Sequence, residues 1–394
     1  MRGHLVTTVV ETTDQPPSRA TSRGPESRSR ERIVGLDAAR GLAVLGMIGA
    51  HLVLVDAFDW ANPETWFDLV NGRSAILFGV MAGVSLSLVG ARGRAAGGVE
   101  LVRVRLSISV RAVAIFVIAT LLEAIDPGFP IILGTYAVVF VAGAWLISVR
   151  SRTLLIAAGI AMLVAPVLVV FARGVFFFSD PELPVVTTDL IYILILSDFS
   201  AVLWVAFLMV GIVIGRLDLG AVRTHIRLAV VGVGLMVIGY GLGELGNRFA
   251  PQGFPEESWQ DRFSQLLLQY PHSATTSEAI GSTGFALVVV ALCLAAGSTR
   301  VGRVVVFPVG AVGAMALTAY AGHFVAIILL GSYAEYSTDY TVFVQFLVVT
   351  MAVCVVWRAL LGSGPLERIV TGLARRGARI PAVTFTDRGI AGPR

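Results

Sequence analysis

The residues of this chain best suited to chemistry lie in one apolar stretch, LDAARGLAVLGMIGAH (36–51). It holds Asp37 and Arg40 near its start and His51 at its end. An arginine is always charged and can hold a phosphate through two parallel hydrogen bonds. A desolvated imidazole favours its neutral form and can act as a general base. The stretch therefore combines an anion-binding group with a proton acceptor.

The spacing of Arg40 and His51 places both on one face of a helix. Eleven residues at 100° each leave the two side chains about 20° apart, with a rise of about 16 Å between them. This arrangement suits an elongated ligand with an anionic end at Arg40 and a reactive end at His51. The structural alternative is that Asp37 and Arg40 orient the helix, while His51 hydrogen-bonds a neighbouring helix.

The composition of the chain predicts where these residues lie. Of 394 residues, 56% are hydrophobic and 14% are charged, and the mean hydropathy is +0.82. This favours an all-α, polytopic integral membrane helix bundle over a soluble domain. About 20 apolar residues cross a bilayer. By that measure we predict ten spans: 36–55, 73–91, 106–123, 130–149, 153–172, 196–215, 226–245, 279–297, 312–332 and 341–361.

The charges between these segments predict the orientation. Arginines gather in the N-terminal arm, in every second loop and in the C-terminal tail, whereas the other loops are acidic. By the positive-inside rule both termini are cytoplasmic, in a multi-pass protein of the plasma membrane. Because the basic residues lie in short loops and tails, no nucleic-acid partner is indicated. Cys293 and Cys354 both lie in apolar runs, and neither a disulfide nor a metal site is predicted.

Three parts follow from this pattern. Residues 1–31 are polar and rich in Arg, Ser and Pro, which predicts a disordered basic cytoplasmic arm without a cleaved signal. Residues 32–363 form the ten-span domain. Residues 364–394 form an amphipathic basic tail, predicted to lie on the anionic inner leaflet. The sequence leaves the oligomeric state open and is compatible with a homo-oligomer.

Other polar residues within or beside the spans are candidates for substrate binding. Arg73, which follows Trp66 and Asn71, would bind the acceptor or serve as an interfacial anchor. Arg111 would bind substrate or only snorkel to the surface. His323 follows Tyr320 by one turn, after a predicted helix break near 308–313; it would contact substrate or make a packing hydrogen bond. His272 is predicted to be a loop surface residue.

The first stretch, with an arginine, ten residues and then a histidine, resembles the transmembrane acyltransferase superfamily, which includes the acyltransferase-3 proteins. Together with NGRSAILFGVMAGVSL (71–86), it looks like the bacterial heparan-α-glucosaminide N-acetyltransferase-like group (DUF1624). VGAMALTAYAGHF (312–324) and GPLERI (364–369) are similar to a related bacterial family of unknown function, DUF418. The two regions cover about 60 residues each.

The resemblance implies transfer of an acyl group, usually acetyl, from cytoplasmic acyl-CoA to a sugar or glycolipid of the cell envelope. No bound cofactor is implied, because acetyl-CoA or another acyl-CoA is a substrate. Arg40 would lie near CoA, and His51 would be the catalytic histidine, with Asp37 beside Arg40. Transfer would be direct or through an acyl-histidine.

One departure limits the resemblance. The eukaryotic glucosaminide acetyltransferases carry a catalytic histidine between their first two spans, where this chain has NPETWFDLVNG (62–72) and no histidine. The acceptor therefore cannot be carried over. A transporter or flippase and a non-catalytic partner subunit are the alternatives.

Overall fold

The computed structural model describes residues 33–379, except for 57, 60, 127, 180–189, 250–264 and 332–339. The predicted arm (1–31) lies outside this range, as do residues 380–394 of the tail. The described residues are helical and contain no strand element, which confirms the all-α prediction.

The helices follow the predicted spans in order. They are α1 (Val34–Leu52), α2 (Arg73–Ala96), α3 (Gly98–Glu123), α4 (Leu133–Leu146), α5 (Ser151–Ser179), α7 (Ala201–Ile214), α8 (Val222–Phe249), α10 (Thr276–Ser298), α11 (Arg300–Val305), α12 (Phe307–Ala314), α13 (Ala316–Leu330), α14 (Tyr340–Leu360) and α15 (Pro365–Gly377). Short helical turns are η2 (Pro63–Leu69), η3 (Tyr192–Leu196) and η4 (Gln265–Leu267).

Six helices among the described residues are long and apolar enough to cross a membrane, or seven if the bent pair α12–α13 counts as one span. These helices are compatible with a multi-pass membrane protein. Helices α4 and α7 are apolar but shorter, with 14 residues each. Each predicted span coincides with a helix or with the α12–α13 pair, yet the number ten and the orientation remain predictions.

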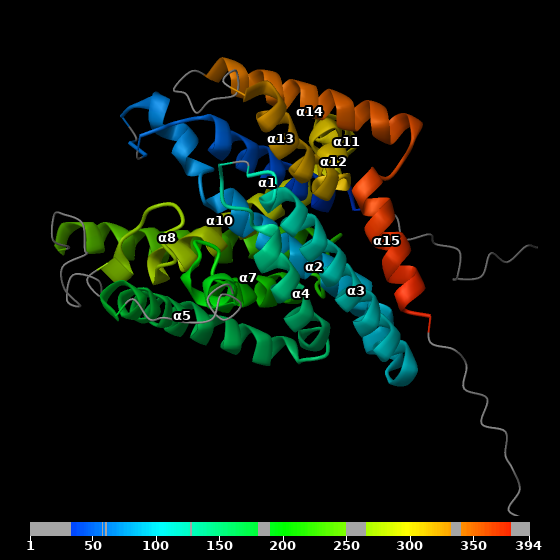
Figure 1. Ribbon diagram of the computed structural model, residues 1–394, viewed down its shortest axis with the longest axis horizontal. Coiled ribbons are helices and arrows are strands. Elements are labelled where there is room, and N and C mark those ends of the chain that lie inside the picture. The colour runs from blue at the N-terminus through cyan, green and yellow to red at the C-terminus, as the bar shows by residue number, and fades with distance from the viewer. Residues whose placement is uncertain are drawn as a thin grey trace, which may run out of the picture. The chain divides into compact units, whose positions relative to one another are not determined.

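Helix α1 packs against α12, α2 and α10 (Figure 1). Its crossing with α12 is close because both helices have glycine at the contact. A Cβ at Gly41 would collide with the Val309 carbonyl, and one at Gly313 would collide with the Asp37 carbonyl. Small residues of this kind allow backbones in membrane bundles to approach. The contact sets Asp37 and Arg40 directly against the end of α12.

The chain bends by 86° between α12 and α13. The break is at Met315, slightly beyond the predicted 308–313, and it exposes the first backbone N–H groups of α13. Glu367 of α15 accepts these donors: Leu317 N and Thr318 N lie 2.8 and 3.0 Å from its Oε1, and the Thr318 hydroxyl lies 2.5 Å from its Oε2. A carboxylate suits a helix N-terminus. The GPLERI segment therefore fixes the start of the helix that carries Tyr320 and His323.

The predicted tail helix is present as α15, and it packs beside α3 (Figure 1). Val370 and Ala374 are buried in that contact, whereas Ile369 and Leu373 stay exposed. Part of the apolar stripe thus faces protein, and the remainder is available for the predicted membrane contact.

Candidate active site

His51 and His323 meet near the end of α1. His51 Nδ1 lies 3.0 Å from His323 Nε2, and the rings stack at 5.2 Å with planes 9° apart. The two residues are 272 positions apart in the chain. One hydrogen bond between two imidazoles requires one ring to donate and the other to accept. When His51 donates through Nδ1, its Nε2 carries a lone pair and can accept a proton.

Aromatic rings hold this pair in place. Phe129 stacks on His51 at 4.9 Å, and Phe324 lies 5.1 Å from the same ring. Tyr320 is edge-on to His323 at 5.2 Å, and its hydroxyl accepts a hydrogen bond from Ile132 N. The surroundings of the pair are therefore apolar and packed, as a group with a fixed orientation requires.

His51 lines a cavity of about 1130 Å³, here called the His51 cavity. Its walls bear many polar groups, and its lining includes Asp68, Asn71, Arg73, Asp198, Tyr240, Glu244, Asn247, Gln269, His272 and Tyr320. Three predicted substrate-binding residues, Asn71, Arg73 and Tyr320, are thus brought together with His51. Trp66 is not. It lies half-exposed on η2 and outside the lining, because the 3-10 turn directs Thr65 and Asp68 inward instead.

Arg73 is held at the start of α2. Its Nε donates to the Tyr240 hydroxyl at 2.9 Å, and its Nη1 donates to the Asp68 carbonyl at 2.6 Å. The guanidinium carbon also lies 5.2 Å from the Tyr240 ring centroid. Arg73 is thus a fixed cation in the wall of the His51 cavity, and its role in acceptor binding stays a prediction.

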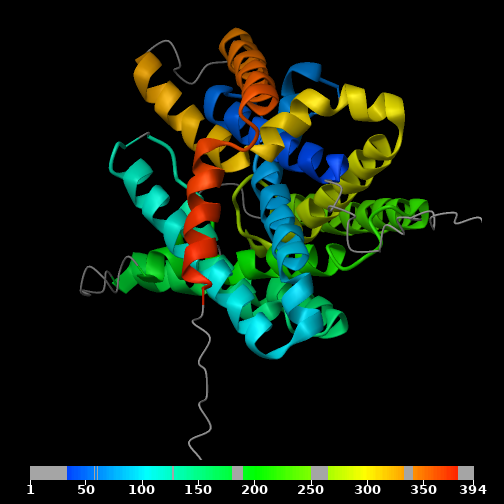
Figure 2. The same cartoon turned by 90° about the vertical axis from the view of Figure 1, so that its right-hand side faces the viewer.

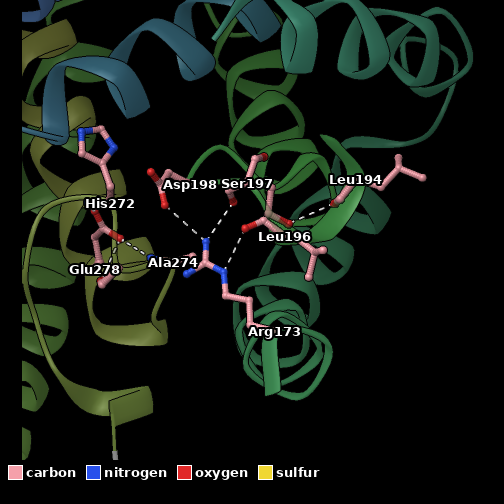
Figure 3. Close-up of polar contacts among 10 residues, drawn as sticks. Arg173, Leu194, Leu196, Ser197, Asp198, His272, Ala274 and Glu278 are labelled. Carbon is pink, nitrogen blue, oxygen red and sulfur yellow. Dashed lines mark hydrogen bonds and ion pairs between the residues drawn. The ribbon is translucent and has the colours of Figure 1, made fainter. Parts of the chain in front are cut away.

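Arg173 and Glu278 hold two segments that contribute to the lining of the His51 cavity, residues 196–198 and 272–274 (Figure 3). Arg173 of α5 donates to the carbonyls of Leu196 and Ser197, both at 3.0 Å, and lies 3.5 Å from the Asp198 carboxylate. Glu278 of α10 accepts from His272 N at 2.7 Å, Ala274 N at 2.8 Å and the Ser273 hydroxyl at 3.0 Å. The two segments touch where the Phe199 and His272 rings meet at 5.2 Å.

His272 lies in a loop and is partly exposed, as predicted, and it also lines the His51 cavity. Its φ is 63°, and that of Ala274 is 55°. Residues with side chains rarely adopt this left-handed conformation, which persists where surrounding contacts impose it. The hydrogen bonds from both backbone N–H groups to Glu278 supply those contacts.

Glu278 is not among the residues predicted from the sequence, although a local signal for it exists. Thr275 and Glu278 have the spacing of a capping box, and the Thr275 hydroxyl accepts from Glu278 N at 3.2 Å. In an ordinary capping box the carboxylate bonds the N-cap N–H. Here it accepts from residues 272–274, four to six residues before it in the chain.

Replacing Glu278 with alanine should leave the backbone N–H groups of His272 and Ala274 without their acceptor and loosen residues 272–274. Unsatisfied buried groups cost about 1–3 kcal/mol each. We expect a lower midpoint in thermal unfolding of the purified protein and faster proteolysis within residues 268–275. Glu278→Gln retains one acceptor oxygen, and its unfolding midpoint and proteolysis rate should lie between those of the wild type and Glu278→Ala. A proteolysis rate for Glu278→Ala equal to that of the wild type would contradict this role.

Asp37 lies at the other end of α1, 2% exposed. Its Oδ1 is 3.1 Å from Arg40 Nη2, and its Oδ2 is 3.7 Å from Arg358 Nη1. Arg40 also donates to the Gly313 carbonyl at 3.1 Å, and Arg358 donates to the Gly310 carbonyl at 3.2 Å. One carboxylate thus ties α1, α12 and α14 together and orients Arg40.

Arg40 lines a second cavity of about 220 Å³, the Arg40 cavity. Arg111 lines it too, and donates to the Thr371 hydroxyl of α15 at 3.5 Å. The Tyr136 hydroxyl is buried and has no hydrogen-bond partner among the described residues. Two guanidinium groups and an unpaired hydroxyl suit an anionic or carbonyl-bearing ligand. The volume fits a narrow chain rather than a whole nucleotide.

Arg40 and His51 therefore line two cavities, where the sequence suggested one continuous ligand path. Between them lies a layer of rings. Phe78 and Tyr136 line the Arg40 cavity, Tyr320 lines the His51 cavity, and Phe78 lies 4.9 Å from Tyr136 and 6.2 Å from Tyr320. A ligand that reaches from Arg40 to His51 must displace these rings.

No cluster of three or more His, Cys, Asp or Glu side chains that could hold a metal ion occurs in the described part of the chain. Cys293 and Cys354 are free and buried.

Comparison with known proteins gives one match. No curated protein and no solved structure matches the chain. The family model described as "Protein of unknown function (DUF418)" matches residues 249–376. The matched region contains Glu278, Tyr320, His323 and Glu367. The match covers less than half of the chain and shows similarity to the DUF418 family over that region.

Proposed function

We propose that this protein is a membrane-embedded acyltransferase. It moves an acyl group, in the first place acetyl, from cytoplasmic acyl-CoA to a glycan or glycolipid acceptor on the other side of the membrane. The observation that carries the proposal is the hydrogen bond between His51 and His323 beside a large cavity whose lining includes many polar residues. His323 Nε2 accepts a hydrogen bond from His51 Nδ1. This bond orients the His51 imidazole and leaves His51 Nε2 as the base.

The proposed reaction requires only His51, the acceptor and the acyl-CoA thioester. His51 Nε2 takes the proton from an acceptor hydroxyl or amine as its oxygen or nitrogen attacks the thioester carbonyl. The carbon–sulfur bond then breaks, and the CoA thiolate receives the proton from the imidazolium. General base catalysis of this kind contributes about 10²–10⁴-fold. Arg73, fixed in the cavity wall, would bind the acceptor or stabilise the oxyanion.

The Arg40 cavity supports the donor side. An extended acyl-CoA arm fits its volume, and Arg40 and Arg111 would meet anionic or carbonyl groups of that arm. The nucleotide would remain outside, at the arginine-rich face that the sequence assigns to the cytoplasm. The thioester would pass the Phe78–Tyr320 layer to reach His51.

The experiment uses purified protein in liposomes made from bacterial envelope lipids, with radiolabelled acetyl-CoA on the arginine-rich side only. We expect label on a lipid or glycan at the opposite face. A transporter or flippase is the alternative, favoured by the broken helix α12–α13 beside the cavities. A transporter or flippase would move a substrate without attaching the label to it, and that result would contradict the acyltransferase proposal.

Arg40→Gln should raise the KM for acetyl-CoA by about tenfold, which corresponds to the loss of one charged hydrogen bond, with a smaller change in kcat. Arg358→Gln is the matched control, since Arg358 shares Asp37 but does not line the Arg40 cavity. Steady-state kinetics in the same liposomes measures both. An unchanged KM in Arg40→Gln would remove Arg40 from donor binding.

A further inference from the structure

A third cavity lies between α13 and α14. This α13–α14 pocket has a volume of about 450 Å³, within the range of small-molecule sites. Most of its lining is apolar, including Met315, Ala319, Ala326, Phe346, Val349 and Val353. Except for His323, no residue used in the proposed acyl transfer lines it.

His323 connects this pocket with the His51 cavity. Its imidazole lines the pocket and is 3% exposed, and its Nε2 bonds His51. Its Nδ1 is buried and makes no hydrogen bond of good geometry, although the Ala319 and Tyr320 carbonyls of its own helix lie near the ring. A buried polar atom without a partner is costly, and one inside an apolar pocket indicates a ligand that completes it.

The pocket is accessible from the side of the bundle. Gly322 lines it and is exposed, and a Cβ built at Gly322 meets nothing within 4 Å. Helix α14 packs mainly against α12 and α1, and α13 runs away from it after the 86° bend (Figure 2). In a membrane-spanning bundle, an opening between two outward-facing apolar helices faces the hydrocarbon of the bilayer.

We propose that the α13–α14 pocket binds a fatty-acyl chain, with the carbonyl oxygen of the chain turned toward His323 Nδ1. A mostly apolar pocket whose lining includes His323, together with Thr318, Gln345 and Thr350, matches a hydrocarbon with a single hydrogen-bonding head. This binding does not depend on acyl transfer by the protein.

The occupant also sets the proton positions in the histidine pair. A carbonyl oxygen only accepts, so His323 must donate through Nδ1 and accept through Nε2. His51 then donates through Nδ1, and its Nε2 carries the lone pair. Occupation of the pocket therefore favours the tautomer in which His51 is a base toward the His51 cavity.

The test uses a photoreactive palmitic acid with purified full-length protein in lipid nanodiscs, followed by peptide mass spectrometry. We expect crosslinks concentrated in α13 and α14. Gly322→Leu fills the pocket and should lower that labelling about tenfold, with Gly322→Ala in between. Gly159→Leu on α5 is the matched control. Gly159 is equally exposed and equally open at Cβ but lines no cavity described above, and its variant should label like the wild type.

Two results would overturn the proposal: equal labelling of Gly322→Leu and wild type, or crosslinks spread at one level over α3, α5, α13 and α14. Competition separates the two sources of such a chain. Stronger competition by palmitoyl-CoA than by palmitate assigns the pocket to a donor's acyl chain, and equal competition assigns it to a free or bilayer lipid. Both results support the site. If no acetyl transfer is found while the crosslinks persist, acyl transfer falls and the pocket stands.

Discussion

His51→Ala should lower the rate of acetyl transfer in liposomes by about 10²–10⁴-fold, the range for loss of a general base. The protein should stay folded, because His51 is only partly buried and lines a cavity instead of filling the core. His225→Gln is the matched control: His225 is buried, bonds the Leu219 carbonyl and lies outside the three cavities. It should retain most of the activity. Equal activity of His51→Ala and wild type would end the acyltransferase proposal.

His323 should act through His51, and its two variants separate positioning from packing. His323→Gln keeps an oxygen that can accept from His51 Nδ1, whereas His323→Ala keeps none. We expect His323→Gln to retain clearly more kcat than His323→Ala, at similar KM for acetyl-CoA. If both lose the same activity, the hydrogen bond between the rings does not orient the base.

Asp37→Ala should lower the free energy of unfolding more than any other single substitution proposed for this protein. Asp37 is the buried carboxylate opposite Arg40 and Arg358, and removal of one partner of a buried ion pair costs about 3–5 kcal/mol. The cost arises because the Arg40 and Arg358 guanidinium groups stay in position without the carboxylate that compensates their charge. Thermal unfolding in detergent, followed by intrinsic fluorescence, should show a clearly lower midpoint and a reduced yield of folded protein.

A double variant separates this charge effect from a simple cavity effect. In Asp37→Ala with Arg358→Met, one uncompensated cation is removed together with the carboxylate. Its midpoint should lie above that of Asp37→Ala alone, although each single change destabilises. Additive losses would show that the carboxylate does not couple α1 to α14.

The sequence alone determined the helical class and the order of the helices, because apolar segment length is a local property that the bilayer imposes on every span. It also made His51, Arg40, Asp37 and His323 candidates, since ionisable residues in apolar segments are rare and costly. Even the break before His323 was visible in Pro308, Gly310 and Gly313, to within a few residues.

Only the tertiary structure decided which of these residues meet. Helical phase placed Arg40 and His51 on one face, but the rings of Phe78, Tyr136 and Tyr320 from three other helices set them in separate cavities. The contact between His51 and His323 spans 272 residues, and no local pattern encodes it. Trp66 lies outside the His51 cavity and His272 lines it, because a turn and a loop take their direction from the hydrogen-bonding group that fixes them. For His272 that group is Glu278.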